Sequence, residues 1–264
     1  MDTRSAPNAC INPVRLGLDS QFTFRCHPGV ACFTQCCRGI SIMLTPYDVI
    51  RLKTRLGLPS DEFLAIYTDL HLLEKTDLPV VSLKQLDDDK QSCPFVREEG
   101  CIVYADRPTA CRYYPLGVAS LQHKEGADDS GFFFFINEPH CRGFEEHAEW
   151  TVAAWRQDQG VALRDEINAE WTDLVVRKRS FPANIKLTEK AKQMFFMVSY
   201  NLDTYRKFVF ESTFLQRMPV DEATRNEIQS DDVALLKFGV AWLKHILFTQ
   251  RDPNQQAAGS NAAP

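Results

Sequence analysis

The cysteines are the residues of this sequence with the clearest capacity for chemistry. Eight of the nine lie within residues 26–141, and the ninth is Cys10. The eight are Cys26, Cys32, Cys36, Cys37, Cys93, Cys101, Cys111 and Cys141. Thiolates are soft ligands that select zinc, copper(I) and iron–sulfur clusters over magnesium or calcium. We therefore take these eight residues as candidate metal ligands.

Disulfides and buried, unreactive thiols are the alternatives to a metal site. Residues 1–12 lack the basic start and apolar run of a secretory signal. We therefore expect a cytoplasmic protein, in a reducing compartment where clustered cysteines bind metal or react more often than they form structural disulfides. A lone cysteine packs well in a core, which suits Cys10 better than the set of eight.

Composition argues against two kinds of partner. The net charge is −5 and no basic stripe is present, so we expect no nucleic-acid partner. No run of about eighteen apolar residues occurs, so we expect no membrane span. The apolar residues 132–136 are too few to cross a bilayer and predict a buried strand instead.

The spacing of the cysteines argues against the commonest metal modules. No C-x-x-C pair occurs, as a zinc ribbon or finger would require. The ferredoxin run is also missing. Cys32 and Cys36 resemble the start of the radical S-adenosylmethionine motif, but its third cysteine would fall on Gly39. Eight thiolates are enough for two four-cysteine sites, or for one site with spare or reactive thiols. Adjacent side chains diverge, so Cys36 and Cys37 do not easily share one tetrahedron.

The chain resembles the YkgJ-like cysteine-cluster family, whose domain is described as zinc- or iron-chelating. The resemblance covers roughly residues 22–143. It rests on the following residues: Cys26, Cys32, Cys36 and Cys37, then Cys93-Pro94-Phe95, Gly100-Cys101-Ile102-Val103-Tyr104, and Arg107-Pro108-Thr109-Ala110-Cys111-Arg112-Tyr113-Tyr114-Pro115-Leu116. The first group is spaced more loosely than the family's C-x-x-C-x-x-C-C pattern. The resemblance implies an iron–sulfur cluster, for example of the 4Fe–4S type, or zinc.

Residues around the cysteines are candidates for supporting roles. Pro94 and Pro108 restrict the backbone beside Cys93 and Cys111. Arg107 and Arg112 can offset the charge of a thiolate cluster or bind a carboxylate, and a surface ion pair is the alternative. Tyr114 can donate a hydrogen bond near sulfur, with core packing as its alternative.

Two histidines are weaker candidates for metal ligation. His27 follows Cys26, and His140 precedes Cys141. Either can complete a site as a nitrogen ligand, as histidine does in mixed zinc sites.

Helix and turn signals place these residues in an α+β, mainly α fold. Thr45, Pro46 and Asp48 predict a helix start, and Gly57 its end. The remaining patterns predict further helices at 60–73, 145–157, 161–177, 188–200, 202–216 and 230–248, and strands at 80–86 and 102–104. Thr188 and Ser230 are the predicted N-caps of the helices at 188–200 and 230–248.

We expect a loop-rich, metal-organised cysteine-cluster module at 22–143 and a helical region packed on it at 144–250. Residues 251–264 are rich in Gln, Ala, Asn and Pro and predict a disordered tail.

Two functions fit these features. The first is a metal-binding protein whose cluster is a structural centre, an electron carrier or a metal handler. The second follows from a resemblance of the cysteine cluster to flagellin lysine N-methylases, which implies cluster-dependent methyl transfer from S-adenosylmethionine to a protein lysine. No independent S-adenosylmethionine motif occurs in the sequence. A protein partner or substrate is expected, but its identity is left open.

Overall fold

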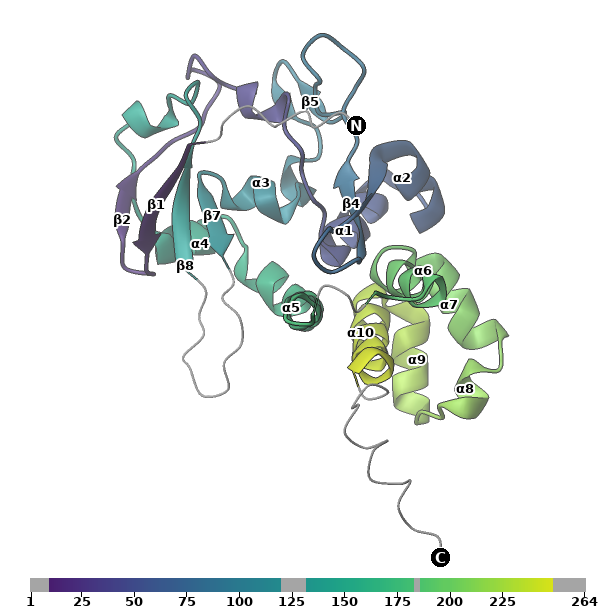
Figure 1. The fold of residues 1–264 in the computed structure, drawn as a ribbon. Coiled ribbons are helices and arrows are strands. Elements are labelled where there is room, and N and C mark those ends of the chain that lie inside the picture. Colours follow the sequence, from purple (N-terminus) through teal and green to yellow (C-terminus); the bar gives the residue numbers. More distant parts are fainter. Residues whose placement is uncertain (1–9, 120–131, 183–185, 249–264) are drawn as a thin grey trace, which may run out of the picture.

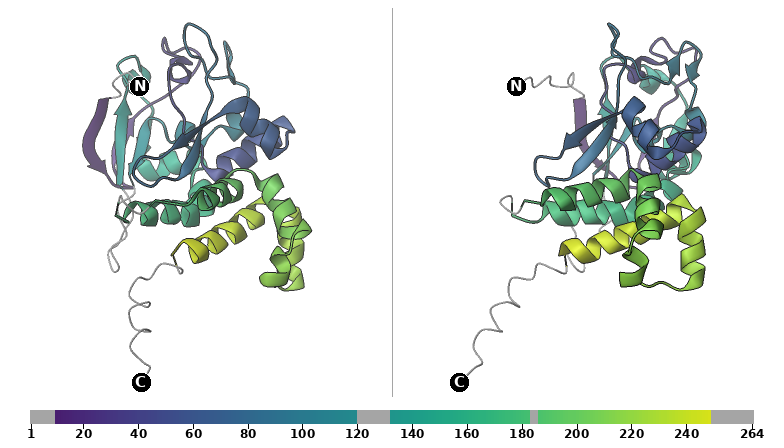
Figure 2. Two further views of the ribbon diagram at one scale, coloured as in Figure 1. Left: turned by 45° about the vertical axis from the view of Figure 1, so that its right-hand side comes forward. Right: turned by 90° about the vertical axis from the view of Figure 1, so that its right-hand side faces the viewer.

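The computed structural model describes residues 10–119, 132–182 and 186–248. Half of the structure is helical and 16% is strand, which confirms the predicted α+β, mainly α class. Figures 1 and 2 show a part made of short strands, loops and short helices, with a layer of longer helices along one side of it. No helix within the described ranges is long and apolar enough to cross a membrane.

A small antiparallel sheet forms one end of the molecule. Its strand order is β1 (Cys10–Leu16), β8 (Phe132–Asn137) and β7 (Leu116–Ala119). The predicted strand at 132–136 is thus the central strand. Beside it, β2 (Gln21–Thr23) pairs with β9 (Glu149–Thr151), and α4 (Val152–Asp158) follows. The aromatic side chains of these elements pack edge to face, for example Phe22 on Trp155.

Two further hairpins lie towards the other end. The buried strand β4 (Pro79–Leu83) pairs with β3 (Thr68–Leu72), and the two-residue strands β5 (Val96–Arg97) and β6 (Gly100–Cys101) pair with each other. The described residues include three short 3-10 helices, η1 (Gln35–Cys37), η2 (Tyr104–Asp106) and η3 (Gly143–Glu145), of which η3 packs beside β8 through Phe144. The single-turn helix α3 (Thr109–Tyr113) follows η2 (Figure 1).

Helix α1 (Pro46–Leu56) follows the predicted signals at both ends. The Thr45 side chain accepts a hydrogen bond from the Asp48 backbone, and the Asp48 carboxylate accepts one from Thr45, which is a capping box. Gly57 ends the helix at φ 66°, in the left-handed region that glycine tolerates. This helix therefore has a fixed start and end.

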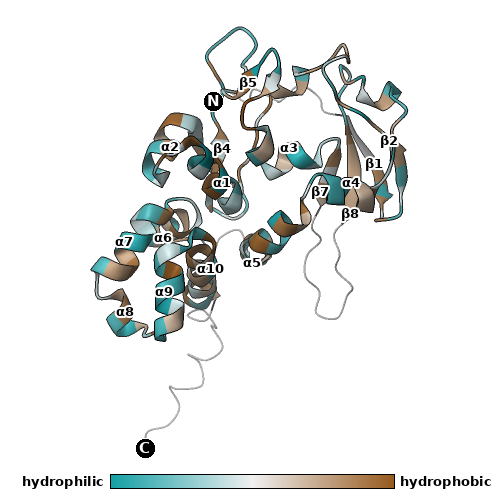
Figure 3. Ribbon diagram, turned by 180° about the vertical axis from the view of Figure 1, so that it is seen from behind, coloured by the Kyte–Doolittle hydropathy of each residue, from teal (hydrophilic) through white to brown (hydrophobic). Residues whose placement is uncertain are grey.

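The longer helices form the second layer. They are α5 (Ala162–Arg179), α6 (Glu189–Ser199), α7 (Leu202–Glu211), α8 (Phe214–Arg217), α9 (Glu222–Ser230) and α10 (Asp232–Phe248). Figure 3 shows that hydrophobic residues dominate α10, which packs against α5, α6 and α9. The predicted N-cap Thr188 is confirmed, since its hydroxyl accepts from Ala191 N at 3.2 Å.

Two hydrophobic cores hold these layers together. The larger core combines α1, α2 (Ser60–Tyr67) and β4 with residues of α5–α10. The smaller core joins Phe24, Tyr113 and Phe133 to Val152 and Trp155. Each core therefore takes residues from both sides of position 143. The predicted tail at 251–264 lies outside the described residues.

Several predicted elements were wrong in extent. The helix expected at 60–73 ends at Tyr67, and residues 68–72 form β3 instead, because the backbone of buried β4 needs a ladder partner. The strand expected at 80–86 is β4, which covers only Pro79–Leu83. Residues 102–104 are not a strand, since β6 ends at Cys101 and the chain turns into η2.

The helical region also differs from the prediction in three places. Residues 149–151 form β9, which pairs with β2, so only the end of the expected 145–157 helix is helical. The helix expected at 202–216 breaks at Ser212, whose hydroxyl donates to Phe208 O and accepts from Phe214 N. Helix α9 was not predicted, and Ser230 is its last residue. Asp231 caps α10, accepting from Val233 N at 2.6 Å and Ala234 N at 2.8 Å.

Candidate metal centre

The eight predicted cysteines come from separate segments of the chain and meet between the two hydrophobic cores. Cys93, Cys101 and Cys111 pack against the larger core, and Cys141 packs against the smaller one. All eight thiols are free. Each of them appears among the electrostatic neighbours of at least one of the others. The structure thus brings the whole predicted set into one neighbourhood.

One set of four thiols, which we call the helix-side group, comprises Cys37, Cys93, Cys101 and Cys111. Cys93 N donates to Cys37 O at 2.8 Å, which ties the second cysteine segment to the first. Cys101 is opposite Val96 in the β5–β6 hairpin, close to Cys93 along the chain. The thiols whose charges act on Cys111 are Cys37, Cys93 and Cys101. Cys111 also acts on Cys36, so this group borders the four thiols described next.

The other four thiols, the sheet-side group, are Cys26, Cys32, Cys36 and Cys141. All four line one small cavity, which Phe24, Val30, Tyr114, His140 and Gly143 complete. Arg142 N donates to the Cys32 sulfur at 3.1 Å, so the segment that carries Cys141 also binds Cys32. Cys26 is exposed, whereas Cys32 is 9% exposed. This group therefore reaches from the protein interior to solvent.

Cys36 and Cys37 are the junction between the two groups. Their side chains are hydrogen bonded to each other, which raises the pKa of Cys36 and lowers that of Cys37. The neighbouring Arg38 cation further lowers the pKa of Cys37. Cys37 is therefore the member of the pair that is favoured as a thiolate.

Burial opposes ionisation of the other thiols. It raises the pKa of Cys26 and of Cys93 to about 11, and it raises that of Cys111 together with the charges of neighbouring thiols. A positive ion counteracts both effects, because it favours the thiolate over the thiol. We therefore expect metal to bind these cysteines as thiolates and to displace their thiol protons.

Backbone N–H groups also point at the sulfurs. The amides of Phe95 and Val96 donate to Cys93, that of Val103 donates to Cys101 and that of Gly143 donates to Cys141. In each case the hydrogen bond favours the thiolate, in opposition to burial. These donors lie two or three residues after the cysteine, so each local turn supplies both the ligand and the group that supports it.

Several buried polar atoms beside the thiols have no hydrogen-bond partner of regular geometry. They are Tyr114 Oη, His140 Nε2, Glu138 Oε2 and Arg38 Nε. Tyr114 faces Cys141, and His140 Nε2 lies 3.3 Å from Glu138 Oε2. Buried polar groups are normally satisfied. A sulfur-rich metal group is consistent with these atoms, because its thiolates and sulfides accept hydrogen bonds and histidine nitrogen can ligate metal.

The two predicted arginines form most of their hydrogen bonds with backbone carbonyls and not with the cysteine thiols. Arg107 is buried, donates to Tyr104 O at 2.7 Å and to Gln159 Oε1, and lies over the Tyr104 ring. Arg107 is also close enough to Cys101 to lower the pKa of that thiol. Arg112 donates to Gln159 O at 2.6 Å and to the carbonyls of Arg107 and Ala105. Their hydrogen bonds therefore fix the segment around Cys111, and a direct cofactor contact stays a prediction.

The two predicted histidines differ in availability. His27 Nδ1 accepts from Gly29 N at 3.1 Å, and Nε2 lies 3.2 Å from Glu146. Both of its ring nitrogens thus have partners. His140 lines the sheet-side cavity beside the thiols, and its Nε2 lies 3.3 Å from Glu138 Oε2 without the geometry of a hydrogen bond. Of the two, only His140 is placed to join the thiols.

Sequence reasoning missed a carboxylate that positions one of the cysteines. Asp48 is fully buried in α1, and its Oδ1 accepts from Thr109 N at 2.8 Å, Thr109 Oγ1 at 2.7 Å and Arg164 Nη1 at 2.9 Å. Thr109 begins α3, the helix that carries Cys111. Asp48 therefore caps both its own helix and that of a candidate ligand. Its place in a capping motif gave no sign of the second role.

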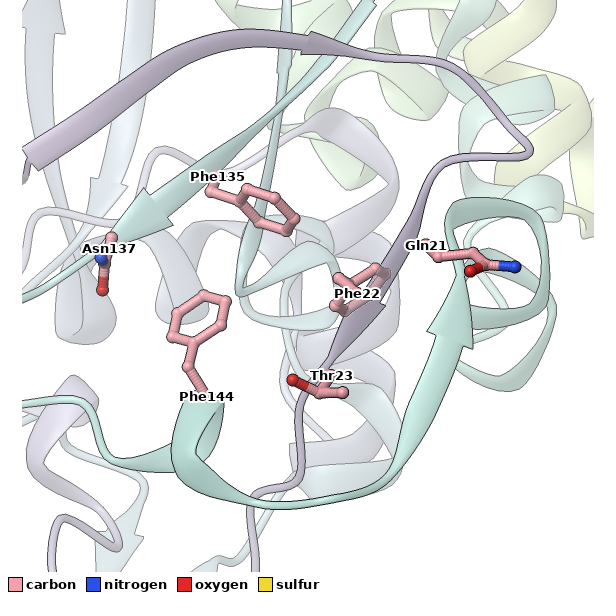
Figure 4. A pocket seen from close by; sticks show the side chains of 6 residues that line it. All are labelled: Gln21, Phe22, Thr23, Phe135, Asn137 and Phe144. Carbon is pink, nitrogen blue, oxygen red and sulfur yellow. The ribbon is translucent and has the colours of Figure 1, made fainter.

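The thiols are not arranged as a closed ion site. Among residues 10–119, 132–182 and 186–248, no three His, Cys, Asp or Glu side chains are placed so that they could hold a metal ion as they stand. A cavity of about 360 Å³ lies elsewhere, between Gln21–Thr23, Phe135, Asn137 and Phe144 (Figure 4). No cysteine lines it.

In the comparisons with known proteins, a match is found over the part of the chain that carries the clustered cysteines. No curated protein and no solved structure matches. The similarity to flagellin lysine N-methylases accordingly stays a prediction. Residues 25–145, slightly less than half of the chain, match the family model named CxxCxxCC, described as "Putative zinc- or iron-chelating domain". That match contains all eight clustered cysteines and supports chelation of zinc or iron by a domain of the CxxCxxCC type.

Proposed function

We propose that this protein is a metal-binding protein whose eight clustered cysteines chelate an iron–sulfur cluster or zinc, with iron–sulfur favoured. The observation that carries the proposal is the meeting of eight free thiols from distant segments, with backbone N–H groups directed at Cys93, Cys101 and Cys141. Soft thiolates select these metals over hard cations. The matched family model supports the same two metals.

The number of ligands favours iron–sulfur over a single zinc. One structural zinc uses four ligands, whereas eight thiols lie together here. The usual zinc spacings are missing from the sequence. The unpaired hydroxyl of Tyr114 and the Arg38 cation supply hydrogen bonding and positive charge, two of the factors that tune iron–sulfur clusters. When bound, such a cluster supplies one-electron chemistry or fixes the fold.

This chain's own residues bind and orient the group. The cysteines of the two groups ligate, Tyr114 hydrogen bonds beside Cys141, and Arg38 offsets thiolate charge at Cys37. Asp48 holds the start of α3 and with it Cys111. Arg107 and Arg112 hold the preceding turn through Gln159. We place this chemistry in a reducing compartment, where the thiols stay free.

Anaerobic purification followed by iron, zinc and acid-labile sulfide analysis tests the proposal. Iron with matching sulfide and a broad absorption band near about 400 nm is the expected result. Stoichiometric zinc without sulfide would leave metal binding intact and reverse the preference for iron. A protein that contains neither metal, and takes up neither on anaerobic reconstitution, would refute the proposed function.

A further inference from the structure

The pair Cys36–Cys37 lies where the two groups of thiols meet. Cys36 lines the sheet-side cavity with Cys26, Cys32 and Cys141. The backbone carbonyl of Cys37, in contrast, accepts from Cys93 N at 2.8 Å, and Cys93 packs against the larger core with Cys101 and Cys111. Consecutive residues thus belong to different groups. Since neighbouring side chains cannot readily take two corners of one tetrahedron, this placement suits ligands of two centres.

Each group has its own structural support. The helix-side group takes its ligands from η1, the β5–β6 hairpin and α3, of which Cys93, Cys101 and Cys111 pack against the larger core. The sheet-side group takes its ligands from residues 26–36 and from the turn after β8, which packs against the smaller core. Asp48 accepts a hydrogen bond from the start of α3, which carries Cys111, and has no such hydrogen bond with the described segments of Cys26 or Cys141. The two sets therefore share η1 and otherwise have separate frameworks.

The buried polar atoms divide in the same way. Tyr114 and His140 line the sheet-side cavity, where Tyr114 Oη faces Cys141 without a regular hydrogen-bond partner and His140 Nε2 lies 3.3 Å from Glu138 Oε2. Arg38 lies beside Cys37 and acts on the helix-side group. Each set of four thiols consequently has at least one unpaired polar atom of its own next to it, as a separate centre would need.

From this arrangement we infer two metal centres, a helix-side one ligated by Cys37, Cys93, Cys101 and Cys111, and a sheet-side one ligated by Cys26, Cys32, Cys36 and Cys141. The inference rests on the proposed function, since it says how that metal is divided. It goes beyond the family model, which names the metals and not the number of sites. Four thiolates fill one tetrahedral zinc site or the corners of one iron–sulfur cluster.

The first experiment measures metal and sulfide per chain in the full-length protein with one ligand removed from each group. Cys101→Ser and Cys141→Ser should each lower the metal content to about half, and the double variant should lower it close to zero. A single eight-thiol centre predicts that either substitution alone removes as much metal as both together. That result would overturn the inference.

A second experiment needs no variant, so a failure of Cys101→Ser to fold does not affect it. Metal-free protein is reconstituted with increasing, limiting Zn²⁺, treated with N-ethylmaleimide, and mapped by mass spectrometry. Protection should appear in two sets of four, with Cys37, Cys93, Cys101 and Cys111 changing together and Cys26, Cys32, Cys36 and Cys141 changing together. Protection that rises in parallel at all eight cysteines would overturn the inference of two centres and leave the proposed function intact. Protein that binds neither zinc nor iron would overturn the proposed function as well.

Discussion

The segment around Cys111 and the segment around Cys26–Cys37 both supply candidate ligands, but they are stabilised differently. Residues 107–113 are fixed by hydrogen bonds to three distant elements. Asp48 of α1 accepts from Thr109, Gln159 accepts from Arg107 and Arg112, and Asp165 of α5 accepts from Tyr113. Protein contacts alone define this segment.

The segment 26–38 depends much more on local turns. Its backbone hydrogen bonds run mainly between residues three apart, such as Val30 N to His27 O and Cys37 N to Thr34 O. Thr34 has φ 65°, which is unfavourable for a β-branched residue. Its long-range contacts are few and include His27 with Glu146 and Cys32 with Arg142 N. The comparison teaches that one side of the site is preformed, whereas the other gains most from bound metal.

Substitution of Asp48 is the strongest test of the preformed side. Asp48→Asn leaves the buried Arg164 guanidinium without a charged partner, and we expect a loss of about 3 kcal/mol or more in unfolding free energy. Urea denaturation of the metal-free protein measures it.

Asp106→Asn is the matched control. Asp106 is also buried, but its partner Arg51 is 44% exposed, so the loss should be about 1 kcal/mol or less. Equal losses in the two variants would show that Asp48 has no special part in holding α3.

Metal removal tests the other side of the comparison. Amide hydrogen exchange in residues 26–38 should accelerate about tenfold or more when metal is removed, because binding free energy then no longer orders their turns. Exchange in α10 should change little, since this helix packs mainly against α5, α6 and α9, which carry no cysteine. Equal acceleration in 26–38 and 107–113 would contradict the distinction between the two segments.

The sequence predicted the residues that act locally. Thr45 and Gly57 mark the ends of α1, because caps depend on neighbours within a few positions. The cysteines and their candidate role were also evident, since thiol chemistry depends on residue type. Fold class followed from the dominant helical periodicity, as in α1 and α6.

Contacts between residues that are far apart in the sequence could not be predicted from the sequence. Asp48 lies 61 positions from Thr109 and 116 from Arg164, so nothing local indicates that it supports α3. Residues 68–72 carry a helical pattern but form β3, because β4 pairs with them. The division of Cys36 and Cys37 between two groups likewise depends on which segments fold beside them.

Removal of the Tyr113 hydroxyl should lower the unfolding free energy less than Asp48→Asn does. The hydroxyl donates to Asp165, which Arg156 also contacts at 2.8 Å. Tyr113→Phe leaves that carboxylate with one partner, so we expect a loss of about 1 kcal/mol in unfolding free energy. Bound metal should be unchanged. A metal content that falls with Tyr113→Phe would show that the fixed segment is less rigid than its contacts indicate.

Substitution of His27 should have the smallest effect on stability and also tests which histidine belongs to the site. His27 and Glu146 are about one-third exposed, so His27→Ala should cost about 0.5 kcal/mol or less. Because both ring nitrogens of His27 already have partners, metal content should stay at the wild-type level. His140→Ala is the counterpart, since His140 lines the sheet-side cavity together with four of the thiols. It should weaken metal retention against a chelator such as EDTA about tenfold, as expected for a supporting residue of a metal site. If His27→Ala loses metal and His140→Ala does not, the loop 26–38 contributes a nitrogen ligand, and its turns must rearrange when metal binds.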